Sequence, residues 1–230
     1  RERGGGDEDR REYARPDPVS RLRHRDSLAA AEPRPGPGRT PGMRANGTAV
    51  SPLALAMPIL ALAAITVAIY VVGQSITPDY SGTALFGKTA TDTLPLKSTL
   101  ASVVLGLAGF QLLSATWIYG NLPRAGSRPG WLPPLHRLAG VTAILVSLPI
   151  AYHCMRAYGV QTFDARIAVH SIAGCFVYGA FAAKVTIVRS KRLPGWTLPL
   201  AGGLLVTLVA VLWYTSALWY YNDFSVPLLK

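Results

Sequence analysis

Charge is scarce in this chain, and acidic charge is scarcest in its second part. Only 15% of the 230 residues are charged, against about 25% in soluble domains. Residues 51–230 contain four acidic residues and twelve lysines or arginines. This balance excludes an ordinary soluble domain and indicates a membrane protein with basic loops. We expect no nucleic-acid partner, because no basic stripe with interleaved aromatic residues is present.

Cysteine is rarer still, with Cys154 and Cys175 as the only two. Both fall in apolar runs at different expected depths, and a disulfide needs Cα atoms within about 7 Å. We expect them to be small apolar residues of the helix core. The sequence also lacks a CxxC motif, a phosphate-binding loop, a nucleophile elbow and paired acids in its apolar runs. These absences argue against several enzyme classes and, weakly, against a cation pump.

The first 48 residues lack any apolar run long enough to bury. They are rich in arginine, glycine and proline, which predicts a disordered extension. The first methionine is Met43, so we hypothesise that translation begins there and that residues 1–42 are an upstream extension. We therefore divide the chain into an extension, residues 1–48, and a membrane domain, residues 50–225.

Five apolar runs are long enough to cross a bilayer, which takes about 20 residues. Backbone groups in lipid must be satisfied within the segment, so each run is expected to be a helix. The fold class is therefore all-α: an integral membrane bundle of five transmembrane helices behind a disordered extension. The expected spans are Pro52–Val72, Ser98–Trp117, Leu135–Met155, Ile167–Val188 and Leu198–Trp219.

Loop charges predict the orientation. The loop Gly120–Pro134 and the segment RSKRLPGW carry basic residues and no acidic ones. The other loops are balanced, and in the first of them Lys88 and Lys97 stand against Asp79 and Asp92. Because positive loops stay in the cytoplasm, we expect a multi-pass protein of the plasma membrane with a cytoplasmic N-terminus and an extracytoplasmic C-terminus.

Three of the four histidines lie in the most hydrophobic third of the chain, at 17-residue intervals: His136, His153 and His170. Ionisable groups inside a membrane are costly and are functional candidates. His153 and His170 are equidistant from the centre of the turn YGVQTFDA, each about five residues, or roughly 7–8 Å, inside its helix. Two histidines at one depth on antiparallel helices predict an axial pair for haem b near the outer face.

The neighbouring residues fit a haem. Gly174 lies one turn from His170 and would leave space for the porphyrin edge. Arg156 and Arg166, at the outer helix ends, would pair with the propionates. Closely packed helices are only about 8–10 Å apart, too near to hold a haem between two histidine ligands. The third and fourth spans would therefore have to be spread, with other helices filling the gap.

Other uses of His153 and His170 stay open. The two side chains could be interhelical hydrogen-bond partners, or line a polar cavity. A zinc or copper ion is a further alternative, although zinc usually takes three or four close ligands. Cys154 could be a third ligand, but it points about 100° away from His153 on the helix.

His136 is expected at the inner face, roughly 25 Å from His153, so it cannot share that haem. We interpret His136 as an interfacial residue and Lys184 as a side chain that snorkels to the inner surface. The alternatives are a quinone contact or a second haem, for which Lys184, or more remotely Met57, would supply the missing ligand.

Several segments carry a family resemblance: FQLLSATWIYGNLPR, LHRLAG, LPIAYHC, VHSIAGCFVYGAFAAKVTIVRSKRLPGW and LWYTSALWYY. Over residues 50–225 the chain resembles an actinobacterial family of multi-helix membrane proteins of unknown function. Its arrangement is similar to b-type cytochrome subunits of the cytochrome b561 and ferric-reductase-like kind. The resemblance implies that His153 and His170 hold haem. Two-haem members of that kind have four ligand histidines, whereas this chain offers three.

Together these features predict a membrane electron-transfer subunit with one haem b, a second being the alternative. Its expected partners are membrane lipid, quinol or quinone, and an extracytoplasmic redox protein; oligomerisation stays open. It would be a subunit of an oxidoreductase without a substrate pocket of its own. The rival is a haem-free structural or assembly subunit whose histidines join helices by hydrogen bonds. A small-solute transporter ranks last, since few polar residues could line a pathway.

Overall fold

The computed structural model describes residues 52–79, 85–87, 90–120, 126–190 and 192–227. These residues belong to one compact unit, Thr48–Lys230. The expected extension and the hypothetical start at Met43 lie outside the described residues.

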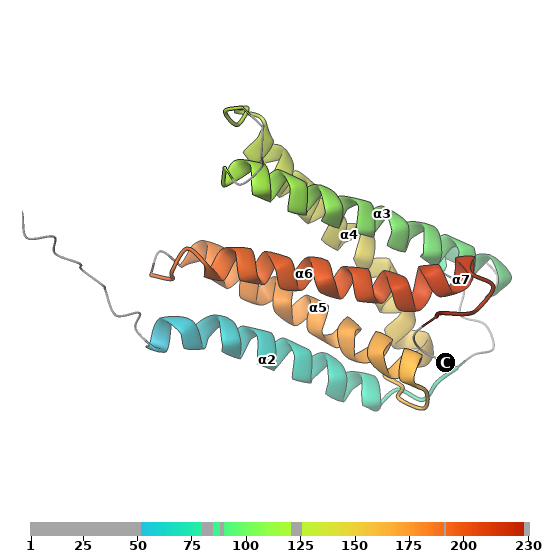
Figure 1. Cartoon of the computed structure of the whole chain (residues 1–230). Helices are drawn as coiled ribbons and strands as arrows, with labels where there is room; N and C mark the ends of the chain where they lie inside the picture. The colour runs from blue at the N-terminus through green and yellow to red at the C-terminus, as the bar shows by residue number, and fades with distance from the viewer. Residues whose placement is uncertain (1–51, 80–84, 88–89, 121–125, 191, 228–230) are drawn as a thin grey trace, which may run out of the picture. The chain divides into compact units, whose positions relative to one another are not determined.

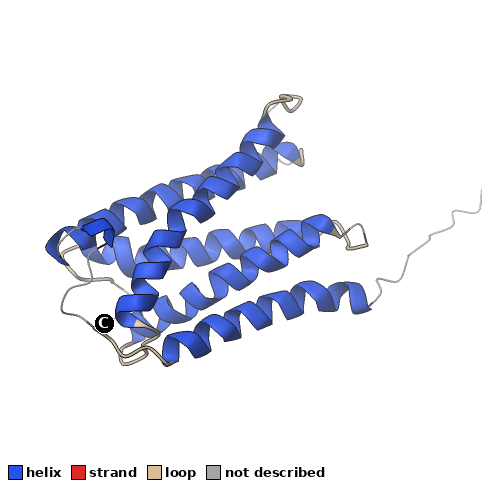
Figure 2. Ribbon diagram, turned by 180° about the vertical axis from the view of Figure 1, so that it is seen from behind, coloured by secondary structure: helices blue, strands red, loops and turns tan. Residues whose placement is uncertain are grey.

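Five spans cross the described unit, and all are helical (Figures 1 and 2). Each is long and apolar enough to span a bilayer, and the described residues contain no strand. This confirms the predicted fold class and shows a multi-pass membrane protein. The first four spans are α2 (Pro52–Gln74), α3 (Ala90–Ile118), α4 (Leu132–Tyr158) and α5 (Ala165–Arg189). The last span consists of α6 (Thr197–Trp213), the π-helical turn η2 (Tyr214–Leu218) and α7 (Trp219–Tyr221). A short 3₁₀ turn, η1, covers Leu85–Gly87.

One boundary differs clearly from the prediction. The second span was expected to begin at Ser98, but α3 begins at Ala90. Its first two turns are polar, with Asp92 placed favourably at the positive end of the helix dipole. A search for apolar runs cannot detect polar turns of this kind. Lys97, which was assigned to a loop, therefore lies on a helix.

The packing of the helices separates α4 from α5. α3 packs against α4 and α6, whereas α5 packs against α2 and α6. The backbones of α4 and α5 do not pack along their lengths, although they are consecutive in the chain (Figures 1 and 2). We call the end at which α4 stops and α5 begins the His170 end, and the opposite end, where α4 begins, the His136 end. The spread of α4 and α5 is the condition that a haem between them requires.

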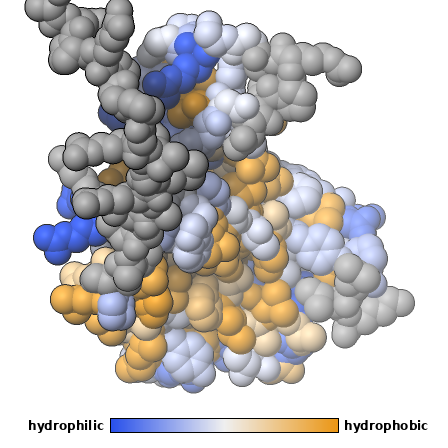
Figure 3. All heavy atoms as spheres, turned by 60° about the vertical axis from the view of Figure 1, so that its left-hand side comes forward, coloured by the Kyte–Doolittle hydropathy of each residue, from blue (hydrophilic) through white to orange (hydrophobic). Residues whose placement is uncertain are grey.

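The outward surface of the spans is apolar. Large aliphatic side chains along α2 and α4 are exposed, among them Leu60, Val71 and Leu145. Apolar side chains cover much of the face seen in Figure 3. In a membrane-spanning unit the outward side chains contact lipid rather than water. Exposed apolar side chains are therefore expected on this surface.

α2 and α5 approach each other closely at Gly179. A Cβ atom built on Gly179 would lie 2.6 Å from the carbonyl oxygen of Leu62 and would also overlap the Thr66 hydroxyl. Small residues at a helix crossing let two backbones approach, which is how helices associate where lipid supplies no hydrophobic driving force. Gly179 therefore fixes α5 against α2.

We expect Gly179→Ala to destabilise the protein by about 1–3 kcal/mol, because the added methyl group has no room and must force the helices apart. The measurement is the midpoint of thermal unfolding in detergent micelles. The matched control is Gly203→Ala on α6, where a Cβ meets nothing within 4 Å. If both variants unfold at the same temperature, the close approach does not hold α2 in place.

Candidate functional site

The helix bounds place His153 and His170 at one depth. His153 lies five residues before the last residue of α4, and His170 five residues after the first residue of α5. Five residues of helix correspond to roughly 7–8 Å. Both histidines therefore lie just inside the His170 end, on two helices whose backbones are spread.

His170 is held by a threonine of the last span. Its Nδ1 atom lies 2.9 Å from the Thr215 hydroxyl oxygen. That hydroxyl donates its own proton to the Val211 carbonyl at 2.8 Å, so its oxygen accepts from Nδ1–H of His170. A neutral imidazole carries one proton. Nε2 of His170 is thus the nitrogen with the lone pair, which is the state required of a metal ligand.

Thr215 is positioned by a π-helical turn. The turn spans Tyr214–Leu218 and interrupts an otherwise α-helical span. Thr215 itself is fully buried. Its backbone carbonyl accepts a hydrogen bond of 2.9 Å from Nη1 of Arg166. Single π turns inside α-helices occur frequently at functional sites. In this one, the hydroxyl and the backbone carbonyl of Thr215 both bond to side chains of α5.

Arg166 is engaged with the last span. Besides its bond to Thr215, its guanidinium carbon lies 4.1 Å from the ring centroid of Trp219. A cation over an indole face is a favourable contact. These contacts tie α5 to the end of the last span. Arg156, the other arginine expected near the propionates, is exposed in the last turn of α4.

His153 is buried on α4, with 5% of its surface exposed. Its ring meets the Tyr158 ring edge to face at 5.8 Å between centroids. Nζ of Lys97, from α3, lies 4.9 Å from the centroid of that same tyrosine ring. Lys97 is also close enough to His170 and Cys154 for its charge to act on both. Lys97 therefore contacts a neighbour of His153 and also acts electrostatically on His170. The sequence reasoning missed this role because it placed Lys97 in a loop.

Gly174 is not required by helix packing. A Cβ atom there would meet only Leu212, at an ordinary contact distance of 3.9 Å. Gly179, by contrast, has backbone against it. The predicted role of Gly174, to leave room beside His170, is compatible with this space.

One contact joins α4 to α5 between the two ends. The hydroxyls of Ser147 and Tyr178 lie 3.0 Å apart, so a long tyrosine side chain reaches across where the backbones do not pack. The described residues contain no cluster of three or more histidine, cysteine or acidic side chains that could hold a metal ion.

His136 has the same kind of anchor as His170. Its Nδ1 atom lies 2.7 Å from the Ser114 hydroxyl oxygen on α3. Ser114 donates to the Phe110 carbonyl at 2.6 Å, so Nδ1–H of His136 is again the donor and Nε2 carries the lone pair. The Gln111 amide donates to the backbone carbonyl of His136. Sequence reasoning found both histidines but neither anchor.

Gly140 makes room for that amide. A Cβ atom on Gly140 would lie 3.2 Å from the Gln111 side-chain oxygen. The glycines of LHRLAG and VHSIAG therefore differ in role. Gly140 accommodates the Gln111 side chain, whereas a Cβ atom on Gly174 would meet only Leu212 at an ordinary contact distance. Lys184 of α5 lies near enough for its charge to act on His136.

Residues 55–228 match a family described as a family of unknown function, DUF6529. The chain belongs to the DUF6529 family. The match begins at the fourth residue of α2 and covers the other four spans of this DUF6529 protein in full, which confirms the expected membership in a membrane family of unknown function. No curated protein and no solved structure matches the chain. An actinobacterial origin and a likeness to cytochrome b561 stay predictions.

Thr215→Val should destabilise the protein by about 1–3 kcal/mol, because it leaves Nδ1–H of half-buried His170 without its acceptor while keeping the side-chain volume. The check is thermal unfolding in micelles, with Thr207→Val as the control, since Thr207 is exposed on the same helix. Equal losses in the two variants would show that the anchor contributes nothing.

Proposed function

We propose that this protein is a membrane electron-transfer subunit that holds haem b between α4 and α5, with His153 and His170 as axial ligands. Haem supplies one-electron redox chemistry when bound, and the protein supplies ligands and an apolar surrounding. The observation that carries the proposal is the anchoring of His170. Its Nδ1 is committed to Thr215, and its Nε2 is left as a lone-pair nitrogen.

The positions of the helices support the same proposal. α4 and α5 do not pack along their lengths, so a ligand pair on them does not face the distance limit of adjacent helices. His153 and His170 lie at one depth, with Gly174 one turn from His170. Arg156 and Arg166 lie at the same end for the propionates; Arg166 would have to leave or share its contacts with Thr215 and Trp219.

The electron partners we propose are quinol or quinone in the bilayer and a redox protein at the His170 end. A second haem is the alternative at the His136 end. Support for it is that Nε2 of His136 carries a lone pair and that Lys184 lies nearby on α5. That same pair of groups, an acceptor nitrogen and a cation, would also suit the hydroxyl and carbonyl of a quinol or quinone.

The second candidate function is a haem-free structural or assembly subunit. The observation that favours it is that His136 and His170 both make interhelical hydrogen bonds. In this alternative the bonds themselves are the purpose of the histidines. They would add specificity to helix packing, as polar pairs in membranes do.

The absorption spectrum of the purified protein separates the two functions. We expect a Soret band and reducible α band, lost in His153→Ala and in His170→Ala and kept in His136→Ala. The Ser147→Ala variant controls for general damage to the α4–α5 contact. A folded, colourless wild type would refute the haem proposal and favour the structural subunit. Haem retained in His153→Ala or in His170→Ala would refute the assignment of these two histidines as the ligand pair.

We further propose that the His136 end faces the cytoplasm. All four acidic residues of the described chain lie at the His170 end: Asp79, Asp92, Asp164 and Asp223. Described basic residues at the His136 end include Arg128, Arg189 and Arg192. Positive charge is retained on the cytoplasmic side.

This orientation predicts an extracytoplasmic C-terminus. Alkaline phosphatase fused after Lys230 should be active, because it folds only outside the cytoplasm, and green fluorescent protein fused at the same point should be dark. The reverse pattern would place the His136 end outside.

A further inference from the structure

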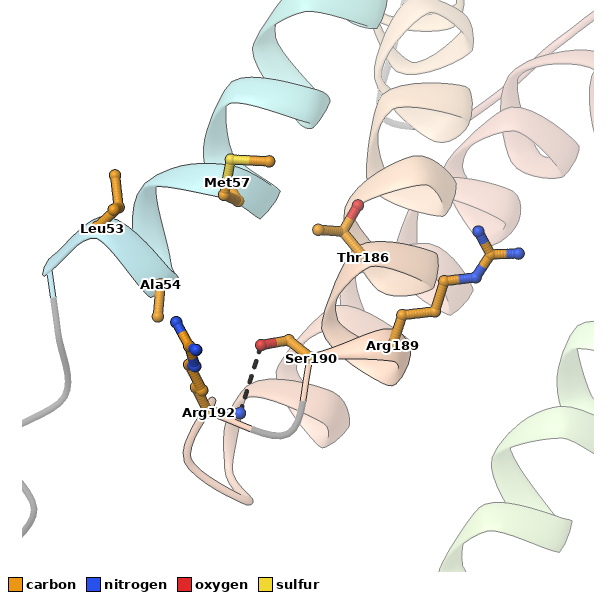
Figure 4. A pocket seen from close by; sticks show the side chains of 7 residues that line it. All are labelled: Leu53, Ala54, Met57, Thr186, Arg189, Ser190 and Arg192. Carbon is orange, nitrogen blue, oxygen red and sulfur yellow. Dashed lines mark hydrogen bonds between the residues drawn. The ribbon is translucent and has the colours of Figure 1, made fainter.

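A cavity of about 390 Å³ opens at the His136 end, between the start of α2 and the end of α5 (Figure 4). α2 lines it with Leu53, Ala54 and Met57, all apolar. The end of α5 and the turn after it supply the polar lining: Thr186, Arg189, Ser190 and Arg192. The cavity is separate from the histidines of the proposed haem site, and its lining contains no acidic residue.

Arg192 and Ser190 form the polar part of this cavity. In Figure 4 the Arg192 guanidinium reaches toward Ala54 across the opening, whereas the Arg189 guanidinium is turned away from α2. The Ser190 oxygen accepts from the backbone N–H of Arg192 at 3.4 Å, which leaves the hydroxyl proton for another acceptor. A guanidinium and a hydroxyl donor together suit an oxyanion, above all a phosphate.

The opposite wall suits a hydrocarbon chain. Leu53 and Met57 are exposed, at 74% and 57% of their surface, and the exposed side chains that follow them on α2 are apolar as far as Ala68. α2 packs mainly against α5 and so keeps a broad side toward lipid. A ligand in this cavity therefore meets cationic groups at the membrane surface and apolar side chains directed along the span.

We propose that this cavity binds an anionic phospholipid, with the headgroup phosphate at Arg192 and Ser190 and an acyl chain along Leu53 and Met57. Charge complementarity supports this occupant, since the described acidic residues all lie at the opposite end of the spans. Basic pockets between transmembrane helices are known sites for acidic headgroups. Inorganic phosphate shares the headgroup chemistry but makes no use of the apolar wall.

The test is native mass spectrometry of the full chain in a neutral detergent, titrated with phosphatidylglycerol or phosphatidylcholine. We expect saturable binding of phosphatidylglycerol at one site, and binding of phosphatidylcholine at least about fivefold weaker, because one cation near an acidic headgroup changes binding by about that factor. Arg192→Gln should weaken phosphatidylglycerol binding by about fivefold, and Ser190→Ala should weaken it to a smaller extent.

Arg128→Gln is the matched control. Arg128 is an exposed arginine at the same membrane end that does not line the cavity, so its loss should leave phosphatidylglycerol binding unchanged. Leu53→Gln should also weaken phosphatidylglycerol binding, because it makes the hydrocarbon wall polar.

Three results would overturn the proposal. Equal binding of the two lipids would show a site without charge selection. Equal losses in Arg192→Gln and Arg128→Gln would show attraction to the whole basic surface rather than to this cavity. Displacement of the lipid by millimolar inorganic phosphate, with Leu53→Gln unaffected, would identify a phosphate site that ignores the acyl chain.

Discussion

A polar side chain inside a hydrocarbon layer must find its partner within the protein, and three hydroxyls of this chain meet that demand in one way. Ser102, Ser114 and Thr215 each donate their proton to the carbonyl four residues back in their own helix. Each oxygen then accepts from a ring N–H on another helix: Trp213, His136 and His170, respectively. Because the hydroxyl proton is already used, the direction of the second bond is determined.

This arrangement has a structural and a chemical consequence. The bonds join α3 to α4, α3 to the last span, and α5 to the last span, which are three of the four pairs of spans that pack; the fourth pair is α2 and α5. At the two histidines the same bonds also select the Nδ1–H tautomer. One hydrogen bond thus joins two helices and also leaves Nε2 of the histidine with its lone pair free of a proton. The proposed haem-binding function and its haem-free alternative therefore both use the same hydrogen bonds.

α5 is attached to two other spans, α2 and the last span. Gly179 brings its backbone close to α2, and His170 and Arg166 attach it to the π-helical turn of the last span. Ser190, the residue that caps the C-terminus of α5, lines the cavity beside α2. The side of α5 toward α4 is different, since the hydroxyl contact of Tyr178 with Ser147 spans the distance there in place of backbone packing. The proposed haem site and the proposed lipid site therefore lie on different sides and at opposite ends of the same helix.

The sequence by itself determined the five spans, because about 20 consecutive apolar residues leave the backbone no alternative to a helix in lipid. It also determined the matched depth of His153 and His170, since rise per residue converts position in the chain into depth. It could not reveal the polar first turns of α3, and so Lys97 was misplaced. Only the tertiary structure decided which helices pack, and hence that α4 and α5 are spread. It also decided that Thr215 and Ser114 anchor histidines 45 and 22 residues away in the chain. Local periodicity carries no information on such pairs, because side chains far apart in sequence meet only through the arrangement of the helices that carry them.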